Sequence, residues 1–250
     1  MAASGLPAEK CEVHKIMLGG GFGRRGFVDY VEQAVLIAKQ MPGIPIKLLW
    51  SREEDMTQGR YHPITQCKLT GGFDANNNLT ALHVRISGQS ILTSVRPEAL
   101  VNGMDPATFQ GMAPSGEFEF GYSAIPNFLI DHAMRNQHVP PGFWRGVNIN
   151  QNCIFAECFM DELAQAVGQD ELEFRRKLLA KNPRMLGVLN LAAEKAGYGK
   201  PLPKGQFHGV AVTNNVGSFT AQVAEVSIEK GKAKVHKLTI ATDCGYNVNP

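Results

Sequence analysis

The chain has 250 residues and a net charge of +2, with 44% hydrophobic and 19% charged residues. This is a globular composition that excludes long disorder, and the near balance of charge excludes a basic nucleic-acid-binding protein. No apolar run approaches the ~20 residues that a membrane-spanning helix needs, and residues 1–10 show no secretory signal pattern. The 26 glycines and 14 prolines predict many loops, where binding sites are often found.

The first fifty residues predict a strand, a glycine-rich loop, a helix and a second strand. Residues 10–18 form the expected first strand, which ends at the glycines of residues 19–21. Apolar residues at helical spacing predict a helix over residues 28–39, and residues 44–50 predict a buried strand. This order of elements is a βαβ unit.

The middle of the chain changes character. Residues 64–72 and 79–87 predict a β-hairpin around a turn at residues 74–78, because Asn and Asp tolerate left-handed backbone. Residues 89–122 show no periodicity, and such long irregular stretches are usually functional when they are apolar. Residues 125–134 predict a further strand.

Helices and then strands make up the rest. An apolar stripe over residues 154–166 predicts one helix, Asp170 opens a second that ends near Lys181, and Asn182 opens a third that ends at Gly197. Three strands then predict a β-meander, over residues 209–216, 222–229 and 234–243. The predicted fold class is α+β, with a βαβ start, a hairpin, a helical section and a terminal meander.

The glycine loop satisfies the pattern G-x-G-x-x-G from Gly21 to Gly26. Such loops let backbone N–H groups approach an anionic ligand, often with a helix N-terminus behind them. A nicotinamide or flavin site also wants an acid at the end of the second strand, but Ser51 and Arg52 precede the first acid, Glu53. Glycines needed only for a tight turn are the alternative.

A second candidate loop spans residues 140–148 and carries Arg145 between aromatic residues and glycines. An arginine held there can grip an oxyanion or a phosphate with two parallel hydrogen bonds. The alternative is an exposed arginine on a loop that Phe143 and Trp144 anchor by packing.

Other chemistry finds no support in the sequence. The five cysteines are scattered and odd in number, which predicts small buried side chains without disulfides. The seven histidines have no metal-ligand spacing, and the G-x-S-x-G pattern of a nucleophilic hydrolase is missing. No catalytic residue and no protein metal ligand is therefore predicted.

Four ordered motifs resemble the molybdenum hydroxylases, the family of xanthine dehydrogenase and aldehyde oxidase, and within it the isoquinoline 1-oxidoreductase β-subunit branch. They are the glycine loop at residues 19–25, the segment W-S-R-E-E-D at residues 50–55, G-F-W-R-G-V at residues 142–147 followed by Glu157 and residues 160–164, and D-C-G-Y at residues 243–246 followed by Asn249-Pro250. The resemblance covers essentially the whole chain.

The resemblance implies a molybdopterin-binding part of an oxidoreductase that hydroxylates aldehydes or N-heteroaromatic compounds with oxygen from water. The cofactor is molybdopterin, either as such or in its cytosine dinucleotide form. Its implied contacts are Gly20, Gly21, Phe22, Gly23, Arg24, Trp144, Arg145 and Gly146. The implied partners are an iron–sulfur small subunit, the remainder of the large subunit and a small aldehyde or heteroaromatic substrate.

The chain also departs from the family pattern. Residues 1–182 resemble a first molybdopterin-binding domain, and residues 183–250 the truncated start of a second. The family's catalytic glutamate, in a G-E motif, has no counterpart here. We therefore expect an internal fragment that is inactive alone, and we expect Arg145 to lie near the glycine loop. A nucleotide- or anion-binding module without redox chemistry is the alternative.

Overall fold

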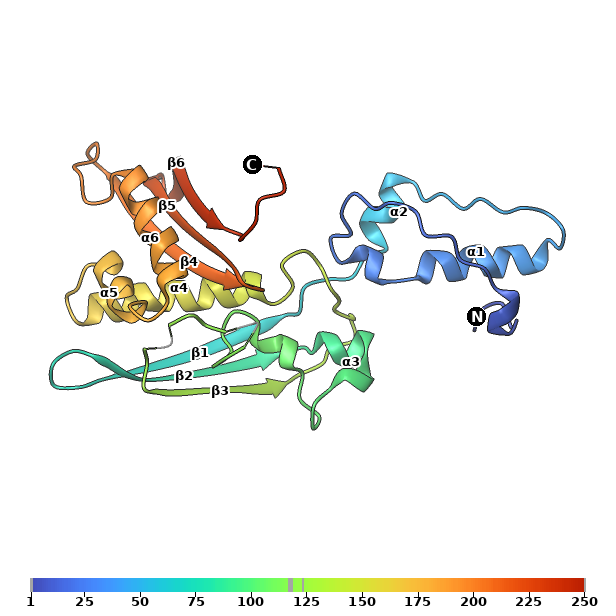
Figure 1. Ribbon diagram of the computed structural model, residues 1–250, viewed down its shortest axis with the longest axis horizontal. Helices are drawn as coiled ribbons and strands as arrows, with labels where there is room; N and C mark the ends of the chain where they lie inside the picture. The colour runs from blue at the N-terminus through green and yellow to red at the C-terminus, as the bar shows by residue number, and fades with distance from the viewer. Residues whose placement is uncertain (1, 117–118, 123, 250) are drawn as a thin grey trace. The chain divides into compact units, whose positions relative to one another are not determined.

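The structure is a computed structural model that describes residues 2–116, 119–122 and 124–249 (Figure 1). Its internal contacts divide the chain into two compact units, each of which is described by itself. The first unit combines residues 1–63 with residues 137–147. The second unit combines residues 64–136 with residues 148–250. Both candidate binding loops belong to the first unit, although they are far apart in the sequence.

The first unit is helical in its described part, with elements η1 (Ala8–Lys10), η2 (Arg24–Gly26), α1 (Asp29–Gln40) and α2 (Arg52–Thr57). The predicted helix after the glycine loop is confirmed as α1. Helix α2 begins at a capping box: Ser51 Oγ accepts from the Glu54 N–H at 3.2 Å, and Glu54 Oε2 accepts from the Ser51 N–H at 3.0 Å. This helix was not predicted, although Ser followed three residues later by Glu is a sequence signal for it.

The two strands predicted on either side of α1 are wrong. Residues 11–18 and 44–50 are neither helix nor strand. Their apolar content indicated buried strands, but Ile16 is 89% exposed and Leu49 is 74% exposed. A strand needs a neighbour to pair its backbone N–H and C=O groups, and no segment of the described chain pairs with these. The βαβ start is therefore a helix between two unpaired segments.

The second unit begins with a three-stranded sheet in the order β1 (Thr65–Phe73), β2 (Leu79–Gly88) and β3 (Asn127–Met134). Strands β1 and β2 are antiparallel, and β3 pairs with β2 in parallel. The predicted hairpin and third strand are confirmed. The hairpin turn depends on Asp74, whose Oδ1 accepts the N–H groups of Asn76 and Asn78, and on Asn77 with a φ of 59°.

The irregular stretch crosses from β2 to β3 and contains α3 (Ile91–Val95), η3 (Pro97–Ala99) and η4 (Pro106–Phe109). The buried side-chain amide of Asn152, in the helix that follows β3, holds this stretch in place. Asn152 Nδ2 donates to the carbonyl oxygens of Thr108 and Gln110, at 2.8 and 2.9 Å. This stretch is therefore ordered by side chains that satisfy its backbone, without a regular hydrogen-bond ladder.

Three helices follow, α4 (Ile149–Ala166), α5 (Glu171–Leu178) and α6 (Pro183–Ala196). The predicted caps are confirmed. Asp170 Oδ1 accepts the N–H groups of Leu172 and Glu173 at 3.0 Å. Asn182 Oδ1 accepts from the Met185 N–H, and Gly197 ends α6 with a φ of 71°.

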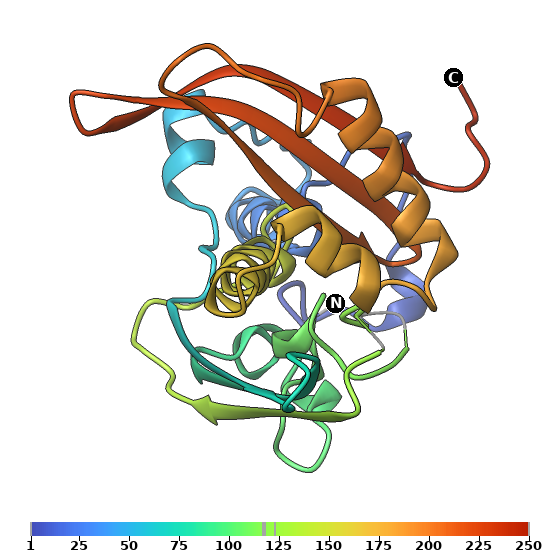
Figure 2. The same cartoon turned by 90° about the vertical axis from the view of Figure 1, so that its left-hand side faces the viewer.

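The terminal meander is confirmed as an antiparallel sheet in the order β4 (Gln206–Asn215), β5 (Ser218–Glu229) and β6 (Lys232–Asp243). Helix α6 packs along one face of this sheet (Figure 2). Helix α4 contacts both β1 and β4. Gly71 makes the first contact possible, since a Cβ there would lie 2.5 Å from Leu163 Cδ2.

All five cysteines are free, but the prediction that they are buried is wrong. Cys158 and Cys244 are exposed, and the other three are half-buried. Burial raises the pKa of Cys67 to about 11. In the described part of the chain, no helix has the length and apolar character needed to cross a bilayer.

Candidate cofactor site

A backbone hydrogen bond joins the two candidate loops of the first unit. The Arg145 N–H donates to the Phe22 carbonyl oxygen at 3.1 Å. The prediction that Arg145 lies near the glycine loop is therefore confirmed. All eight predicted contact residues belong to this unit and lie on the two joined loops.

Gly23 is the point of closest approach between the loops. A Cβ at this position would lie 1.6 Å from the carbonyl oxygen of Phe143 and 3.1 Å from the Trp144 nitrogen. Its φ of 83° also favours glycine. By contrast, a Cβ at Gly26 would meet nothing within 4 Å. Gly23 is thus required for the two loops to meet, whatever they bind.

The glycine loop leaves backbone donors unused. The N–H groups of residues 20–23 hydrogen-bond no other residue that the structure describes, whereas those of Arg25 and Gly26 close turns within the loop. Phe22 has a φ of 51° and its side chain is 61% exposed. Such a run of free donors with left-handed residues is typical of anion-binding loops.

Arg24 is held inside the unit. Its guanidinium donates two hydrogen bonds to the Asp29 carboxylate, at 2.8 and 3.0 Å, and lies 5.0 Å from the Trp50 ring centre. Burial opposes ionisation of Asp29, but the hydrogen bonds and charge of Arg24 outweigh it and lower the pKa of that carboxyl. The Arg24 side chain therefore fixes the glycine loop to α1, and any ligand meets chiefly its backbone.

The Arg24–Asp29 pair bears on the expectation that the N-terminus of α1 attracts an anionic ligand to the loop. The turn η2 separates the glycines from α1, and Asp29 occupies the first turn of that helix. An acid there satisfies the positive end of the helix dipole. The positive charge that a ligand would meet therefore comes from exposed arginines such as Arg145 rather than from the N-terminus of α1.

Aromatic contacts support the second loop. Trp144 stacks on His62 with ring centres 5.3 Å apart and planes 15° apart, and it remains 49% exposed. Phe143 stacks on Phe27 at 6.4 Å. The predicted packing role thus fits Phe143 better than Trp144. The part of His62 was missed, because a single histidine carries no local signal of its ring partner.

Tight turns hold Arg145 and Gly146 at the end of this loop. The Val147 N–H donates to the Trp144 carbonyl oxygen at 2.6 Å. Gly146 has a φ of 85°, and Val147 follows with a φ of 47°. Arg145 itself is exposed. A non-glycine residue with positive φ is uncommon and is often found at a functional turn.

Glu157, which follows the G-F-W-R-G-V motif in the sequence, has a structural role. Glu157 is buried in the second unit, where it accepts from Tyr122 Oη at 2.8 Å, Arg175 Nε at 2.9 Å and the Val212 N–H at 2.9 Å. Every bond fixes a different segment of that unit to α4. Glu157 is therefore occupied by structural contacts.

A nicotinamide site is not favoured by the position of Glu53. This residue lies in the first turn of α2 and is exposed. In a dinucleotide fold the ribose-binding acid stands at the end of a strand. Glu53 follows an unpaired segment instead.

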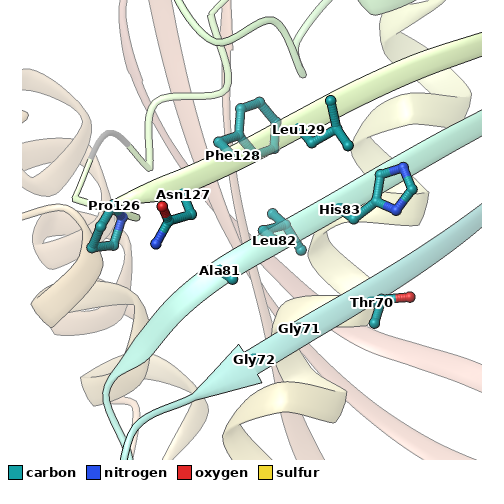
Figure 3. Close-up of a pocket in the computed structure, with 10 residues that line it drawn as sticks. All are labelled: Thr70, Gly71, Gly72, Ala81, Leu82, His83, Pro126, Asn127, Phe128 and Leu129. Atoms are coloured by element: carbon teal, nitrogen blue, oxygen red, sulfur yellow. The ribbon is translucent and has the colours of Figure 1, made fainter.

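A hollow of about 550 Å³ lies elsewhere, on the outer face of the β1–β2–β3 sheet (Figure 3). It forms where Gly72 and Ala81 leave the face bare between Thr70, His83, Asn127 and Leu129. None of the predicted site residues lines it. Asp131, two residues after Leu129 on β3, already bonds His83 and Arg85.

The residues of the joined loops fit a planar, anionic cofactor. Unused backbone donors, an exposed arginine and two exposed aromatic rings, Phe22 and Trp144, are on the same unit. No cluster of three or more His, Cys, Asp or Glu side chains within the described residues is arranged to hold a metal ion.

Comparison with known proteins defines the class. The chain matches the molybdopterin cofactor-binding domain over residues 1–179. The aldehyde oxidoreductase from Desulfovibrio gigas shares its fold, with a TM-score of 0.52 and 18% identity over 88% of this chain and 26% of that one. The chain therefore belongs to the molybdopterin-binding domain family of the molybdenum hydroxylases, as its four motifs predicted.

Curated relatives agree with this assignment. The chain is 30% identical to a protein named membrane-bound aldehyde dehydrogenase [pyrroloquinoline-quinone] from Gluconacetobacter polyoxogenes, over 98% of this chain and 34% of that protein. It is 24% identical to isoquinoline 1-oxidoreductase subunit beta from Brevundimonas diminuta, over 98% of this chain and 32% of that subunit. The chain thus spans about a third of the length of these relatives.

Proposed function

We propose that the joined loops of the first unit bind molybdopterin in an oxidoreductase acting on aldehydes or N-heteroaromatic compounds. The observation that carries this proposal is the hydrogen bond from the Arg145 N–H to the Phe22 carbonyl oxygen. It unites the eight candidate residues, namely Gly20, Gly21, Phe22, Gly23, Arg24, Trp144, Arg145 and Gly146, on one scaffold.

Each group has a definite part in binding. The N–H groups of residues 20–23 donate to anionic atoms of the cofactor, and Arg145 adds a positive charge. Phe22 and Trp144 offer apolar faces that exclude water from a planar ring. When bound, the molybdenum cofactor would supply the metal that accepts two electrons.

The wider assembly is proposed on the same basis. Residues 1–182 form the first molybdopterin-binding domain and residues 183–250 begin the second, a division that the family match to residues 1–179 supports. The partners are the rest of the large subunit and an iron–sulfur small subunit. The cytosine dinucleotide form of the cofactor suits the same anion-binding loop.

Turnover by this chain alone is not expected. A hydroxylase needs a carboxylate base beside the reacting centre, and such catalysis contributes roughly 10²- to 10⁴-fold. Asp29 is the first acid after the glycine loop, but its carboxylate is bonded to Arg24 and so is not free to act as that base. Purification from a host that makes molybdopterin, followed by assay with aldehydes and an artificial electron acceptor, tests this point. Stoichiometric molybdenum with turnover would contradict it.

Binding itself is tested by nuclear magnetic resonance on the full chain. Molybdopterin, released anaerobically from a purified molybdoenzyme, should shift the amide signals of residues 19–27 and 142–147. Gly23→Ala should abolish these shifts, because its Cβ forces the loops apart, whereas Gly26→Ala should keep them. Shifts confined to the β1–β3 sheet, or none, would overturn the proposal.

Titrations with other ligands distinguish molybdopterin binding from the alternative functions. Inorganic phosphate and AMP are offered in parallel, because a nucleotide- or anion-binding module would respond to them as strongly as to molybdopterin. Pyrroloquinoline quinone is offered because the name of one relative contains it. A response to the quinone alone would replace molybdopterin as the proposed cofactor.

A further inference from the structure

The indole of Trp144 is the exposed half of a two-ring stack. Its partner is the His62 imidazole, 5.3 Å away between ring centres and inclined by only 15°. His62 is half-buried, whereas Trp144 is 49% exposed in spite of the stack. One face of the indole is therefore covered, and much of the remaining ring is open to solvent.

The backbone around this stack is held at several points. The Gly142 N–H donates to the Tyr61 carbonyl oxygen at 3.0 Å, and Tyr61 forms a β-bridge with Pro141. Gly142 is buried, and a Cβ on it would lie 2.5 Å from the Arg60 Cβ. These contacts fix the segment that carries His62 against the loop that carries Trp144, so the stack is built before any ligand arrives.

An exposed indole on a fixed loop has a recognisable use. Large apolar rings are normally covered, and the neighbouring Phe143 follows this rule by stacking on Phe27. Trp144 instead leaves its ring 49% exposed, one position before the exposed Arg145. A rigid, exposed aromatic ring is a typical surface for stacking flat, nitrogen-containing rings.

We propose that His62 is a positioning residue that holds the Trp144 indole as a stacking surface for a planar nitrogen heteroaromatic ring. The inference rests on the proposed function, in which two such rings occur: the pterin of the cofactor and an N-heteroaromatic substrate. Both offer the same stacking chemistry. His62 acts through Trp144 and touches neither ring.

Fluorescence of the full chain tests this inference without metal or turnover. The chain has two tryptophans, and Trp50→Phe leaves Trp144 as the sole reporter while keeping a ring beside Arg24. The probes are 6-hydroxymethylpterin and isoquinoline, titrated separately while Trp144 emission is recorded. The probe with the lower dissociation constant in these titrations identifies which ring the surface accepts.

Three substitutions in that background decide the role of His62. His62→Ala should weaken binding of the preferred probe by about 2- to 12-fold, since an aromatic pair contributes ~0.5–1.5 kcal/mol. His62→Phe should restore it, because a flat ring again supports the indole. Tyr61→Ala, which removes an exposed neighbouring ring, should bind as the parent does.

The outcomes are distinguishable from failure of the proposed function. Equal affinity of His62→Ala and the parent, or no quenching by either probe, would overturn the inference on the stack. Loss of binding in both His62→Ala and His62→Phe would show that the imidazole itself contacts the ligand. The amide shifts with molybdopterin are measured separately, and they stand or fall with the proposed function alone.

Discussion

Arg175 Nε donates to Glu157 Oε2 at 2.9 Å, and both side chains are almost completely buried. Arg175 also bonds Asp161 Oδ1 at 2.6 Å and the Glu157 carbonyl oxygen at 2.8 Å. The same Glu157 carboxylate accepts from Val212 on β4. This ion pair therefore ties α4, α5 and the second sheet together in the interior of the second unit.

Removing one partner of this pair should destabilise the unit. Glu157→Gln leaves the Arg175 charge buried with Asp161 as its remaining acid, and we expect a loss of about 3 kcal/mol in the free energy of unfolding. Urea denaturation followed by far-ultraviolet circular dichroism measures the change. Glu194→Gln is the matched control, because its pair with Lys195 is exposed and should contribute little. Equal midpoints for the two variants would contradict the structural role of Glu157.

A second prediction concerns the charge on Asp243, in the D-C-G-Y motif. Arg184 donates two hydrogen bonds to its carboxylate, at 2.9 and 2.8 Å, and the Gly245 N–H donates a third. These bonds lower the pKa of Asp243 from 3.8 to about 2. Because the folded pKa is depressed, the stabilisation is complete above pH ~4 and is lost as the pH falls through about 2.

Carboxyl ¹³C resonances measured against pH should report that value. Arg184→Met removes the largest cause, so the pKa of Asp243 should rise toward 3.8. Arg176→Met, on α5, is the control and should leave Asp243 unchanged. A wild-type pKa near 3.8 would mean that the contact between α6 and β6 does not persist in solution.

Gly23 supports a third prediction, on the junction of the two loops. Gly23→Ala places a methyl group on the Phe143 carbonyl oxygen and strains a φ of 83°. Strain of this kind costs ~1–3 kcal/mol, so exchange of the Arg145 N–H with deuterium should accelerate at least about five-fold. Gly26→Ala, whose Cβ meets open space, should exchange as the wild type does. The same rate in both variants would show that the loops do not depend on Gly23.

Local signals predicted most of the second unit. Asp170, Asn182 and Gly197 each cap a helix through their own side chain or their own φ, so neighbours in sequence were sufficient. The hairpin turn at residues 74–78 is equally local. These elements required no knowledge of distant contacts.

The first unit was harder because its structure depends on distant partners. Apolar residues 11–18 and 44–50 indicate strands only if another strand is available to pair with them. Arg24 gave no sign that Asp29 and Trp50 would hold its guanidinium. The nearness of Arg145 to Phe22 came from the family resemblance, since spacing alone does not bring two distant loops together.

The last prediction concerns the edge of the second sheet. Strand β6 pairs only with β5 among the described strands, and its outward side chains Val235, Leu238 and Ile240 are 61%, 49% and 53% exposed. Lys232, Lys234 and Lys237 protect the first half of this edge, whereas the second half around Leu238 and Ile240 is apolar and favours pairing between chains. We therefore expect the purified chain to self-associate as its concentration rises, with sedimentation velocity as the measurement.

Ile240→Lys should weaken association by about ten-fold or more, because a charge on the strand opposes edge pairing. Leu191→Lys removes a similarly exposed leucine from α6, and it should leave association unchanged. If both substitutions weaken association equally, general apolar exposure drives it and the edge of β6 has no special part.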